Sequence, residues 1–320
     1  MQLRMRQLAS TALVLAALCA VAGQARAAET LVVRFAYQDR VGSVIPIVAV
    51  RQGFFKEAGV DVEAKQFNNG PACAEALYSG AVDVAAMGDT AALLMVARHP
   101  GVVMLASHAT GEGRHRVMVK AGAPEKSLAD LKGKRIGVKK GTSTYGGLLL
   151  ALSKAGMTDA DVTLMDLNPP AMAEALAAGS IDAFAASEPT PSVAETKGAR
   201  QLVDLSGLGN DYPIMLLARS ASVAAHKETF GKFFAALAKA QAWASAHPEE
   251  TAQLMAETSG LPLPAVRAAM ARHAYALRLD DAIVASLAQT ADFLVREHIL
   301  DTTPDFAVVV DRSFVREGLE

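Results

Sequence analysis

Two acidic side chains, Asp89 and Glu188, occupy the same place in two similar stretches of the chain, each at the far end of an apolar run. Two carboxylates facing one cleft would repel a bare dianion and could hold an ammonium group. Hydroxyl groups follow a glycine at residues 142–144, where a helix is expected to begin. Helix N-termini expose unpaired amides and partial positive charge, so this turn could hold a small anion. A zwitterion would satisfy both kinds of group.

Both features also have a purely structural interpretation. The helix dipole stabilises an acid in the first turn by about 0.3–1 kcal/mol, so Asp89 and Glu188 could simply cap the helices that follow them. Serine and threonine at such turns commonly cap helices, and residues 142–144 could do the same. Capping and ligand binding do not exclude each other, and the sequence leaves both open.

The two acids belong to an internal repeat. Residues 69–90 align without gaps onto residues 168–189, and ten of the twenty-two positions are identical. Alanine supplies four identities, so coincidence in an alanine-rich chain is the alternative, but asparagine, proline, glutamate, leucine, glycine and aspartate also match. Two separated copies predict two similar lobes rather than a solenoid, which needs at least about three tandem repeats.

The elements that would position these residues follow an α/β pattern. Short β-branched runs alternate with helical patterns as far as residue 218, and later residues are almost all helical. Ligands bind at the carboxyl ends of strands in open α/β folds, so two such lobes would share one cleft. The expected strands are 31–36, 60–66, 82–87, 102–107, 116–119, 135–138, 162–166, 181–186 and 200–204; the expected helices are 45–52, 72–79, 91–98, 145–154, 171–178, 191–197, 226–247, 248–259, 262–276 and 280–297.

Length and composition limit the function. The chain has 320 residues, 52% of them hydrophobic and 20% charged, with a formal net charge of −2, which favours two globular domains. The sequence contains no block of five or more basic residues, so nucleic acid is not an expected partner. Its seven histidines lack metal-ligand spacing, and we expect neither a metal nor a cofactor.

The first 27 residues have the pattern of a secretory signal peptide. Two arginines precede an apolar run, Leu8 to Ala22, which is followed by small residues. This run is shorter than the roughly 20 residues that cross a bilayer comfortably. We expect cleavage after Ala27 and a periplasmic protein. Cleavage would leave Cys73 as the single cysteine, which cannot form an internal disulfide.

Several segments, in order and spacing, resemble the periplasmic solute-binding proteins of nitrate, sulfonate and taurine ABC importers, and the aliphatic sulfonate and taurine branch in particular. The resemblance extends over nearly all of the mature length, and the ordered combination of segments carries it rather than any single motif. These segments are 52–63, Gly70 and Pro71, Gly80, Gly88 and Asp89, 130–137, 141–144, 182–189, Ala242 and Trp243, and 247–250.

The resemblance implies a two-lobed periplasmic-binding-protein fold, also called a Venus flytrap fold, with a ligand cleft between the lobes. Lobe one would comprise residues 28–117 plus 216–320, with the C-terminal helices packing on it, and lobe two residues 118–215. The chain would cross between lobes near residues 114–121 and 213–218. Hinge closure would then bring both lobes against the ligand.

The resemblance also implies a function: the extracytoplasmic substrate-binding component of an ABC importer. It would capture a small anionic or zwitterionic organic solute, of the sulfonate or taurine type, and deliver it to the membrane permease. We expect a monomer without catalytic residues. Residue by residue, the implied ligand-binding set is Gln38, Ser43, Asn69, Gly70, Pro71, Asp89, Thr90, Thr110, Thr142, Ser143, Thr144 and Glu188.

Two other functions stay open, because a fold does not decide function. One is an enzyme on the same two-lobed scaffold, of the lyase or pyrimidine-precursor type, although the sequence has no Gly-x-Ser-x-Gly motif and no phosphate loop. The other is a sensor that presents its closed form to a membrane receptor. The basic run Arg114 to Arg116 could contact an anion or the permease, but we expect a solvated crossing segment there.

Overall fold

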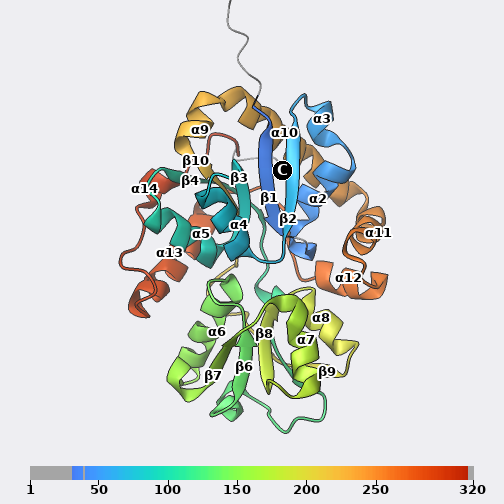
Figure 1. The fold of residues 1–320 in the computed structure, drawn as a ribbon, viewed down its shortest axis with the longest axis vertical. Coiled ribbons are helices and arrows are strands. Elements are labelled where there is room, and N and C mark those ends of the chain that lie inside the picture. Colours follow the sequence, from blue (N-terminus) through green and yellow to red (C-terminus); the bar gives the residue numbers. More distant parts are fainter. Residues whose placement is uncertain (1–30, 39, 316–320) are drawn as a thin grey trace, which may run out of the picture. The chain divides into compact units, whose positions relative to one another are not determined.

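A computed structural model describes residues 31–38 and 40–315. The predicted signal peptide, residues 1–27, lies outside these ranges. The described strands form two five-stranded sheets, and helices cover both (Figure 1). Within the described residues, we find no helix with the length and apolar character needed to span a bilayer.

The first sheet has the strand order β2-β1-β3-β10-β4. Its first three strands are parallel, and β10 is antiparallel to both of its neighbours. Parallel strands are joined by crossover helices that cover both faces of a sheet, so central strands read as continuous apolar runs. The strands are β1 (Val33–Gln38), β2 (Val62–Phe67), β3 (Val84–Gly88), β4 (Val102–Ala109) and β10 (Ile214–Arg219).

The second sheet has the order β7-β6-β8-β5-β9. β6 is parallel to β7 and β8, and β5 is antiparallel to β8 and β9. The two sheets therefore have the same topology, with β10 and β5 as the equivalent antiparallel strands. The strands are β5 (His115–Lys120), β6 (Arg135–Val138), β7 (Thr163–Asp166), β8 (Ala183–Ser187) and β9 (Ala199–Asp204).

The internal repeat falls on equivalent parts of the two sheets. Its first copy forms helix α4 (Gly70–Tyr78) and strand β3, and its second copy forms helix α7 (Pro169–Ala178) and strand β8. The copies thus lie in two separate sheets rather than in one. The two-lobed fold expected from the repeat and from the resemblance is confirmed.

A matching ion pair opens the repeated strand in each sheet. Arg34 of β1 pairs with Asp83, with Nη2 at 2.8 Å from Oδ1 and the backbone N at 3.0 Å from Oδ2. Arg135 of β6 pairs with Asp182 in the same way, at 2.9 and 2.8 Å. The hydrogen bond from Arg135 lowers the pKa of Asp182 to about 2. The aspartate shared by the two copies therefore has a structural role in joining neighbouring strands.

The chain crosses between the sheets at two places, and both lie a few residues earlier than expected. β4 ends at Ala109 and β5 begins at His115, whereas β9 ends at Asp204 and β10 begins at Ile214. Residues 214–218 of the expected crossing 213–218 belong to strand β10, because this apolar run pairs with β3 on one side and β4 on the other. We propose that the lobe boundaries lie within these two crossings.

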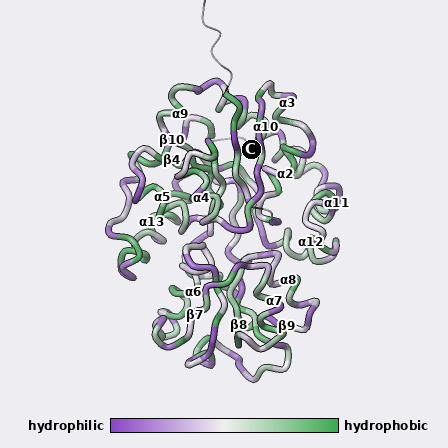
Figure 2. Tube along the Cα trace, in the orientation of Figure 1, coloured by the Kyte–Doolittle hydropathy of each residue, from purple (hydrophilic) through white to green (hydrophobic). Residues whose placement is uncertain are grey.

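The long C-terminal helices pack on the first sheet, as expected. Helix α13 (Asp281–Arg296) contributes Leu287 to a core that also contains Met87 of β3. On helix α10 (Lys227–Ala246), the ring of Phe233 lies 5.1 Å from that of Phe35 in β1. Hydrophobic and hydrophilic colours alternate along these helices in Figure 2, which is typical of helices with one buried face.

Helix α12 (Leu263–Met270) is shorter than the helix expected over 262–276. The following residues leave the helix and run beside β4, where the backbones of Thr110 and Ala274 exchange two hydrogen bonds of 2.9 Å. The backbone N–H and C=O of Ala274 thus bond to the chain at the end of β4 instead of forming hydrogen bonds within a longer helix. The remaining helices are α2 (Val44–Arg51), α3 (Phe54–Glu57), α5 (Asp89–Arg98), α6 (Ser143–Lys154), α8 (Thr190–Glu195), α9 (Ser220–Ala225), α11 (Pro248–Ser259) and α14 (Phe306–Val309), with short 3-10 turns at Val41–Ser43, Glu112–Arg114, Leu128–Leu131 and Asp159–Asp161.

Candidate functional site

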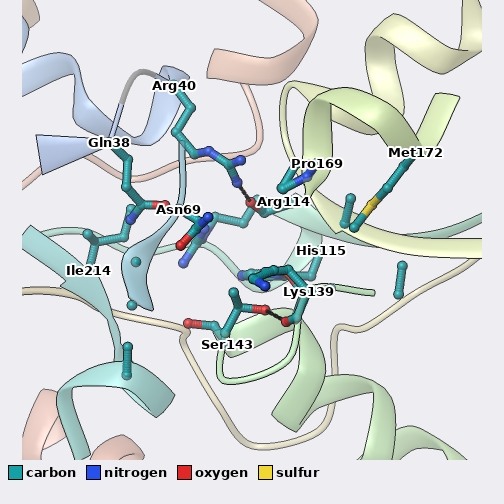
Figure 3. Close-up of a pocket in the computed structure, with 18 residues that line it drawn as sticks. Gln38, Arg40, Asn69, Arg114, His115, Lys139, Ser143, Pro169, Met172 and Ile214 are labelled. Atoms are coloured by element: carbon teal, nitrogen blue, oxygen red, sulfur yellow. Dashed lines mark hydrogen bonds between the residues drawn. The ribbon is translucent and has the colours of Figure 1, made fainter. Parts of the chain in front are cut away.

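A small cavity lies where residues of both lobes meet, and Figure 3 shows the side chains around it. Its volume is about 30 Å³, which is room for about two water molecules. The strand ends and the helix starts of both sheets contribute, as the fold predicts. The lining residues are Gln38, Arg40, Asn69, Gly70, Gly88, Ala91, Arg114, His115, Lys139, Thr142, Ser143, Thr144, Pro169, Met172, Ala185, Ala186, Ser187 and Ile214.

Asn69 connects the first lobe to the second. Its Oδ1 accepts a hydrogen bond of 3.0 Å from the backbone N of Ala72 and caps helix α4. Its Nδ2 donates to Oδ1 of Asn168 at 3.2 Å. Asn168 is the equivalent residue of the second repeat copy, so the two copies contact each other directly at the cleft.

The start of helix α6 supplies the second lobe's hydroxyl groups. Thr142 is the N-cap and accepts from the backbone N of Tyr145 at 3.3 Å. Ser143 lies so close to Gly88 of the first lobe that a Cβ at position 88 would stand 2.2 Å from its Oγ. Thr142 is therefore both a helix cap and a cavity residue, which the sequence had left open.

Three cations line the cavity, and none of its lining residues in the described part of the chain is an aspartate or glutamate. Arg40 donates from Nη1 to Oγ of Ser187 across the cleft at 3.0 Å. Arg114 is only 4% exposed and donates from Nη2 to a backbone oxygen at 2.6 Å. Burial lowers the pKa of Arg114 to about 10, so the guanidinium remains charged at neutral pH. Lys139 pairs with Asp166 at 2.9 Å. The arrangement favours an anion.

His115 lines the same cavity from the start of β5 and is 1% exposed. Its Nδ1 lies 2.6 Å from Oγ1 of Thr144, and its ring packs on Tyr212 with centroids 4.3 Å apart. Its Nε2 is buried and has no hydrogen-bond partner among the described residues.

Asp89 is fully buried and does not line the cavity. Its Oδ1 accepts from the backbone N of Thr90 at 2.6 Å, and its Oδ2 accepts from Nδ2 of Asn210 at 2.7 Å. Asn210 in turn accepts from the backbone N of Tyr212 at 2.6 Å. The carboxylate thus holds the second crossing segment against the first lobe.

Glu188 is also fully buried and outside the cavity lining. Its Oε1 lies 2.6 Å from Nη2 of Arg116 and 3.6 Å from Nε of Arg272. Its Oε2 accepts from the backbone N of Ser192 in the first turn of α8 at 3.2 Å. The structure therefore gives Glu188 a capping and ion-pairing role, and Arg272 extends this pair to the first lobe.

The structure brings half of the expected site residues together at the cavity. Ser43 is buried at the start of α2, and Thr110 is tied to Ala274 through its backbone. Thr90 follows Asp89 in α5, and Pro71 lies beside an open groove on the other side of α4. The residues that line the cavity are Gln38, Asn69, Gly70, Thr142, Ser143 and Thr144, whereas Ser43, Pro71, Asp89, Thr90, Thr110 and Glu188 do not.

The basic run 114–116 was wrongly expected to be a solvated crossing segment. Arg114, His115 and Arg116 are 4%, 1% and 1% exposed. β5 is an internal strand of the second sheet, paired with β8 and β9, and its first five residues are buried. The position of this run between two lobes could have predicted its burial, because charged residues that begin a buried strand must be paired or must form part of a binding site.

The described residues contain no group of three or more histidine, cysteine, aspartate or glutamate side chains that could hold a metal ion. Cys73 is buried in helix α4 and is not among the cavity residues. The chemistry the cavity offers is therefore hydrogen bonding and positive charge.

Comparison with known proteins identifies the family. Residues 43–251, well over half of the chain, match the family described as "NMT1/THI5 like". The chain belongs to the NMT1/THI5-like family. A relative from Brucella abortus (strain 2308), named "Putative binding protein", is 32% identical over 235 residues and aligns over 72% of each chain. The taurine-binding periplasmic protein of Escherichia coli (strain K12) is 31% identical over 197 residues, which cover 61% of this chain and 59% of that protein.

Solved structures of other proteins share the fold. The alkanesulfonate-binding protein SsuA of Xanthomonas axonopodis pv. citri superposes with a TM-score of 0.81 at 26% identity, over 88% of this chain and 98% of that one. The periplasmic aliphatic sulphonate-binding protein SsuA of Escherichia coli superposes with a TM-score of 0.77 at 25% identity, over 90% of this chain and 94% of that one. The desulfurization enzyme DSZB, at 19% identity and a TM-score of 0.70 over 88% and 96%, shares the fold alone.

Proposed function

We propose that the chain is the extracytoplasmic substrate-binding component of an ABC importer and that it captures a small organic anion between its lobes. The family and the relatives named for sulfonate and taurine binding support this function. The cavity supports it as well, because a solute placed there would contact both lobes. Such contacts would favour the closed arrangement over the open one.

The single observation that carries the ligand class is the charge of the cavity lining. Arg40, Arg114 and Lys139 line it, and none of the described lining residues is an aspartate or glutamate. An ammonium group placed there would lose its hydration and face these cations without a counter-charge from the described lining. We therefore propose an anion without a cationic group, such as an alkanesulfonate, in preference to taurine. This replaces the expectation that Asp89 and Glu188 hold an ammonium group.

The size of the cavity bears on how a ligand enters. A volume of about 30 Å³ holds water rather than an organic solute. A sulfonate would therefore enter with the lobes further apart and displace the contacts that Arg40 and Asn69 make across the cleft. The two crossing segments are the natural hinges, because no other backbone connects the lobes in the described chain.

Further parts of the proposal concern location and partners. Relatives named as periplasmic proteins support an extracytoplasmic location. We propose that the leader is cleaved after Ala27, that the mature chain acts as a monomer, and that its closed form delivers the solute to a membrane permease. The surface that the two lobes form together exists only after closure, so a permease could distinguish the closed, loaded protein from the open, empty one.

A thermal-shift screen tests the proposed function. The purified chain is heated with 1-propanesulfonate, taurine, nitrate or benzoate, and the recovered solute is analysed for chemical change. A ligand at 100 times its Kd stabilises the folded state by about 2.7 kcal/mol. We expect 1-propanesulfonate to raise the Tm and to be recovered unchanged. Consumption of the solute would support an enzyme on the same scaffold, and no shift with any of them would contradict the proposal.

A further inference from the structure

His115 is the cavity residue whose chemistry the function described so far does not explain. It is a buried histidine with one ring nitrogen hydrogen-bonded and the other without a partner in the described part of the chain. A buried polar atom without a partner costs free energy, so native structures rarely keep one without a reason. Figure 3 shows the side chain beside Arg114 on the cavity. A solute oxygen in the cavity would supply the missing partner.

Two contacts fix the orientation of the imidazole ring. Nδ1 lies 2.6 Å from Oγ1 of Thr144, which comes from the first turn of α6. One face of the ring packs on Tyr212, which is itself held by a 2.8 Å hydrogen bond from its hydroxyl to the backbone oxygen of Leu205. A ring flip would break the first contact and leave Nδ1 buried without a partner, so Nε2 stays the free nitrogen.

The imidazole is uncharged. Burial, followed by the positive charge of Arg114 and the presence of His273 and Arg40, holds the pKa of His115 well below its usual value of 6.5. Arg114 lies in the first crossing segment, His273 in the loop after α12 and Arg40 in the loop after β1. Each of them lowers the pKa of His115. A neutral imidazole has one donor and one acceptor nitrogen, and the hydrogen bond of one determines the role of the other.

We propose that His115 is a neutral hydrogen-bond donor, through Nε2–H, to an anionic oxygen of the bound solute, and that Thr144 is a positioning residue that fixes this tautomer by donating its hydroxyl to Nδ1. The proposal rests on the proposed function, because it takes the cavity as the ligand site. The three cations that line the cavity require an acceptor on the solute. When the Thr144 hydroxyl donates to Nδ1, that nitrogen is the acceptor and the ring proton lies on Nε2.

The proposal narrows the solute to an oxyanion such as a sulfonate or carboxylate. Arg114 also has a buried Nε without a partner in residues 31–38 and 40–315, so His115 and Arg114 offer one neutral and one charged donor to the same group. A neutral donor adds specificity without adding charge. Because the ring is already neutral, binding through it does not depend on titration of His115 between pH 6 and 8.

The tautomer can be measured directly. The full mature chain is labelled with 15N-histidine, and long-range 1H–15N spectra identify which ring nitrogen of His115 carries the proton, with His115→Phe providing the assignment. We expect Nε2–H, both with and without 1-propanesulfonate. The Nδ1–H tautomer would overturn the proposal, because Nε2 would then be an acceptor. This result is obtained even if no tested solute binds, so it is independent of the proposed function.

Substitutions test the role in binding. His115→Asn keeps an amide near Nδ1 and removes the donor at Nε2, whereas His115→Gln places an amide near Nε2. We expect His115→Asn to weaken 1-propanesulfonate binding about tenfold and His115→Gln to weaken it less, in line with the loss of one buried hydrogen bond. His298→Asn is the matched control, at an exposed position whose positive φ suits asparagine. Equal affinities for His115→Asn and wild type would overturn this proposal and leave the proposed function intact.

Thr144 gives a second test that leaves His115 unchanged. Thr144→Val keeps the shape and removes the hydroxyl, and Thr144→Ser keeps the hydroxyl. We expect Thr144→Val to shift the tautomer signals of His115 and to weaken binding about threefold to tenfold, and Thr144→Ser to behave like the wild type. If Thr144→Val changed neither the spectra nor the affinity, the positioning role would be wrong, because a purely structural threonine would affect stability alone.

Discussion

Asn69 and Asn168 share a hydrogen bond of 3.2 Å across the cleft, although 99 residues separate them. They are equivalent positions of the internal repeat, so the duplicated loops of the two lobes face each other. Only Asn69 also caps a helix, because Asn168 makes no side-chain capping bond. The two equivalent residues therefore have different roles. Asn69 caps its helix and bonds to the other lobe, whereas the Asn168 side chain bonds to the other lobe alone.

This difference gives the first prediction. Asn69→Ala removes a helix cap and should lower the free energy of unfolding by about 1 kcal/mol, whereas Asn168→Ala should leave it nearly unchanged. Both should alter affinity for 1-propanesulfonate, because both remove the contact between lobes. Urea unfolding and calorimetric titration measure the two effects. A loss of stability in Asn168→Ala as large as in Asn69→Ala would contradict the assignment.

The second prediction concerns the close approach of the lobes at Gly88. A Cβ there would stand 2.2 Å from Oγ of Ser143 but 3.4 Å from its Cβ. Gly88→Ala should therefore hold the lobes apart and weaken solute binding at least about tenfold, as a shift of population toward the open form would. Adding Ser143→Ala should restore much of the closure, because the clashing oxygen is gone.

Small-angle scattering measures this effect, with a larger radius of gyration expected for Gly88→Ala alone. Gly231→Ala, on α10 with open space around it, serves as the control and should match the wild type. A double variant as open as Gly88→Ala would show that Ser143 is not the obstacle.

The third prediction concerns the buried pair of Glu188 and Arg116. Removing one charge from a buried pair leaves the other uncompensated, at a typical cost of about 3–5 kcal/mol. Arg116 keeps Glu195 at 2.6 Å as a second partner, so Glu188→Gln should lower the free energy of unfolding by about 2–3 kcal/mol. Glu195→Gln, whose side chain is 43% exposed, should cost under about 1 kcal/mol.

The same variant tests the ligand class. Glu188→Gln should change the affinities for 1-propanesulfonate and for taurine by the same factor, because its carboxylate contacts protein groups. Selective loss of taurine binding would show that Glu188 holds an ammonium group after all.

The fourth prediction is loss of stability in mild acid. Burial, and then the charge of Arg114, lowers the pKa values of His108 and His273 to about 3. The unfolded chain protonates these residues near pH 6.5 and the folded chain does not, so stability is highest above pH 6.5 and falls as the pH drops toward 3. Asp161 and Asp182, with pKa values of about 2, lose their contributions only below about pH 4.

Urea unfolding at pH 7.5 and pH 5.0 measures the histidine contribution. We expect the free energy of unfolding at pH 5.0 to be lower by about 1 kcal/mol or more for each buried histidine. His108→Leu, which removes a fully buried ring without hydrogen-bond partners among the described residues, should reduce the difference. Equal stability at the two pH values would contradict the burial of neutral histidines.

The lobes and their duplication were predictable because local patterns determine them. Alternating strands and helices, and the repeat at residues 69–90 and 168–189, follow from periodicity and spacing along the chain. The turn at Thr142 was also predictable as a helix start, since a capping residue acts on its immediate neighbours.

The partners of the two acids were not predictable in this way. Asp89 binds Asn210, which is 121 residues away, and Glu188 pairs with Arg116 and Arg272. Such contacts depend on how the crossing segments and the chain after α12 fold back on the sheets. The sequence pattern located both acids at strand ends correctly, but their charges are satisfied within the protein.

The most direct test of the central claim is a pair of calorimetric titrations of the wild-type chain with 1-propanesulfonate and with taurine. The two solutes have nearly the same size and differ in whether a methyl or an ammonium group ends the chain. A cavity whose described lining has three cations and no carboxylate should bind 1-propanesulfonate at one site per chain and at least about tenfold more tightly than taurine, since an uncompensated buried charge costs well over 1.4 kcal/mol. Tighter binding of taurine would contradict it.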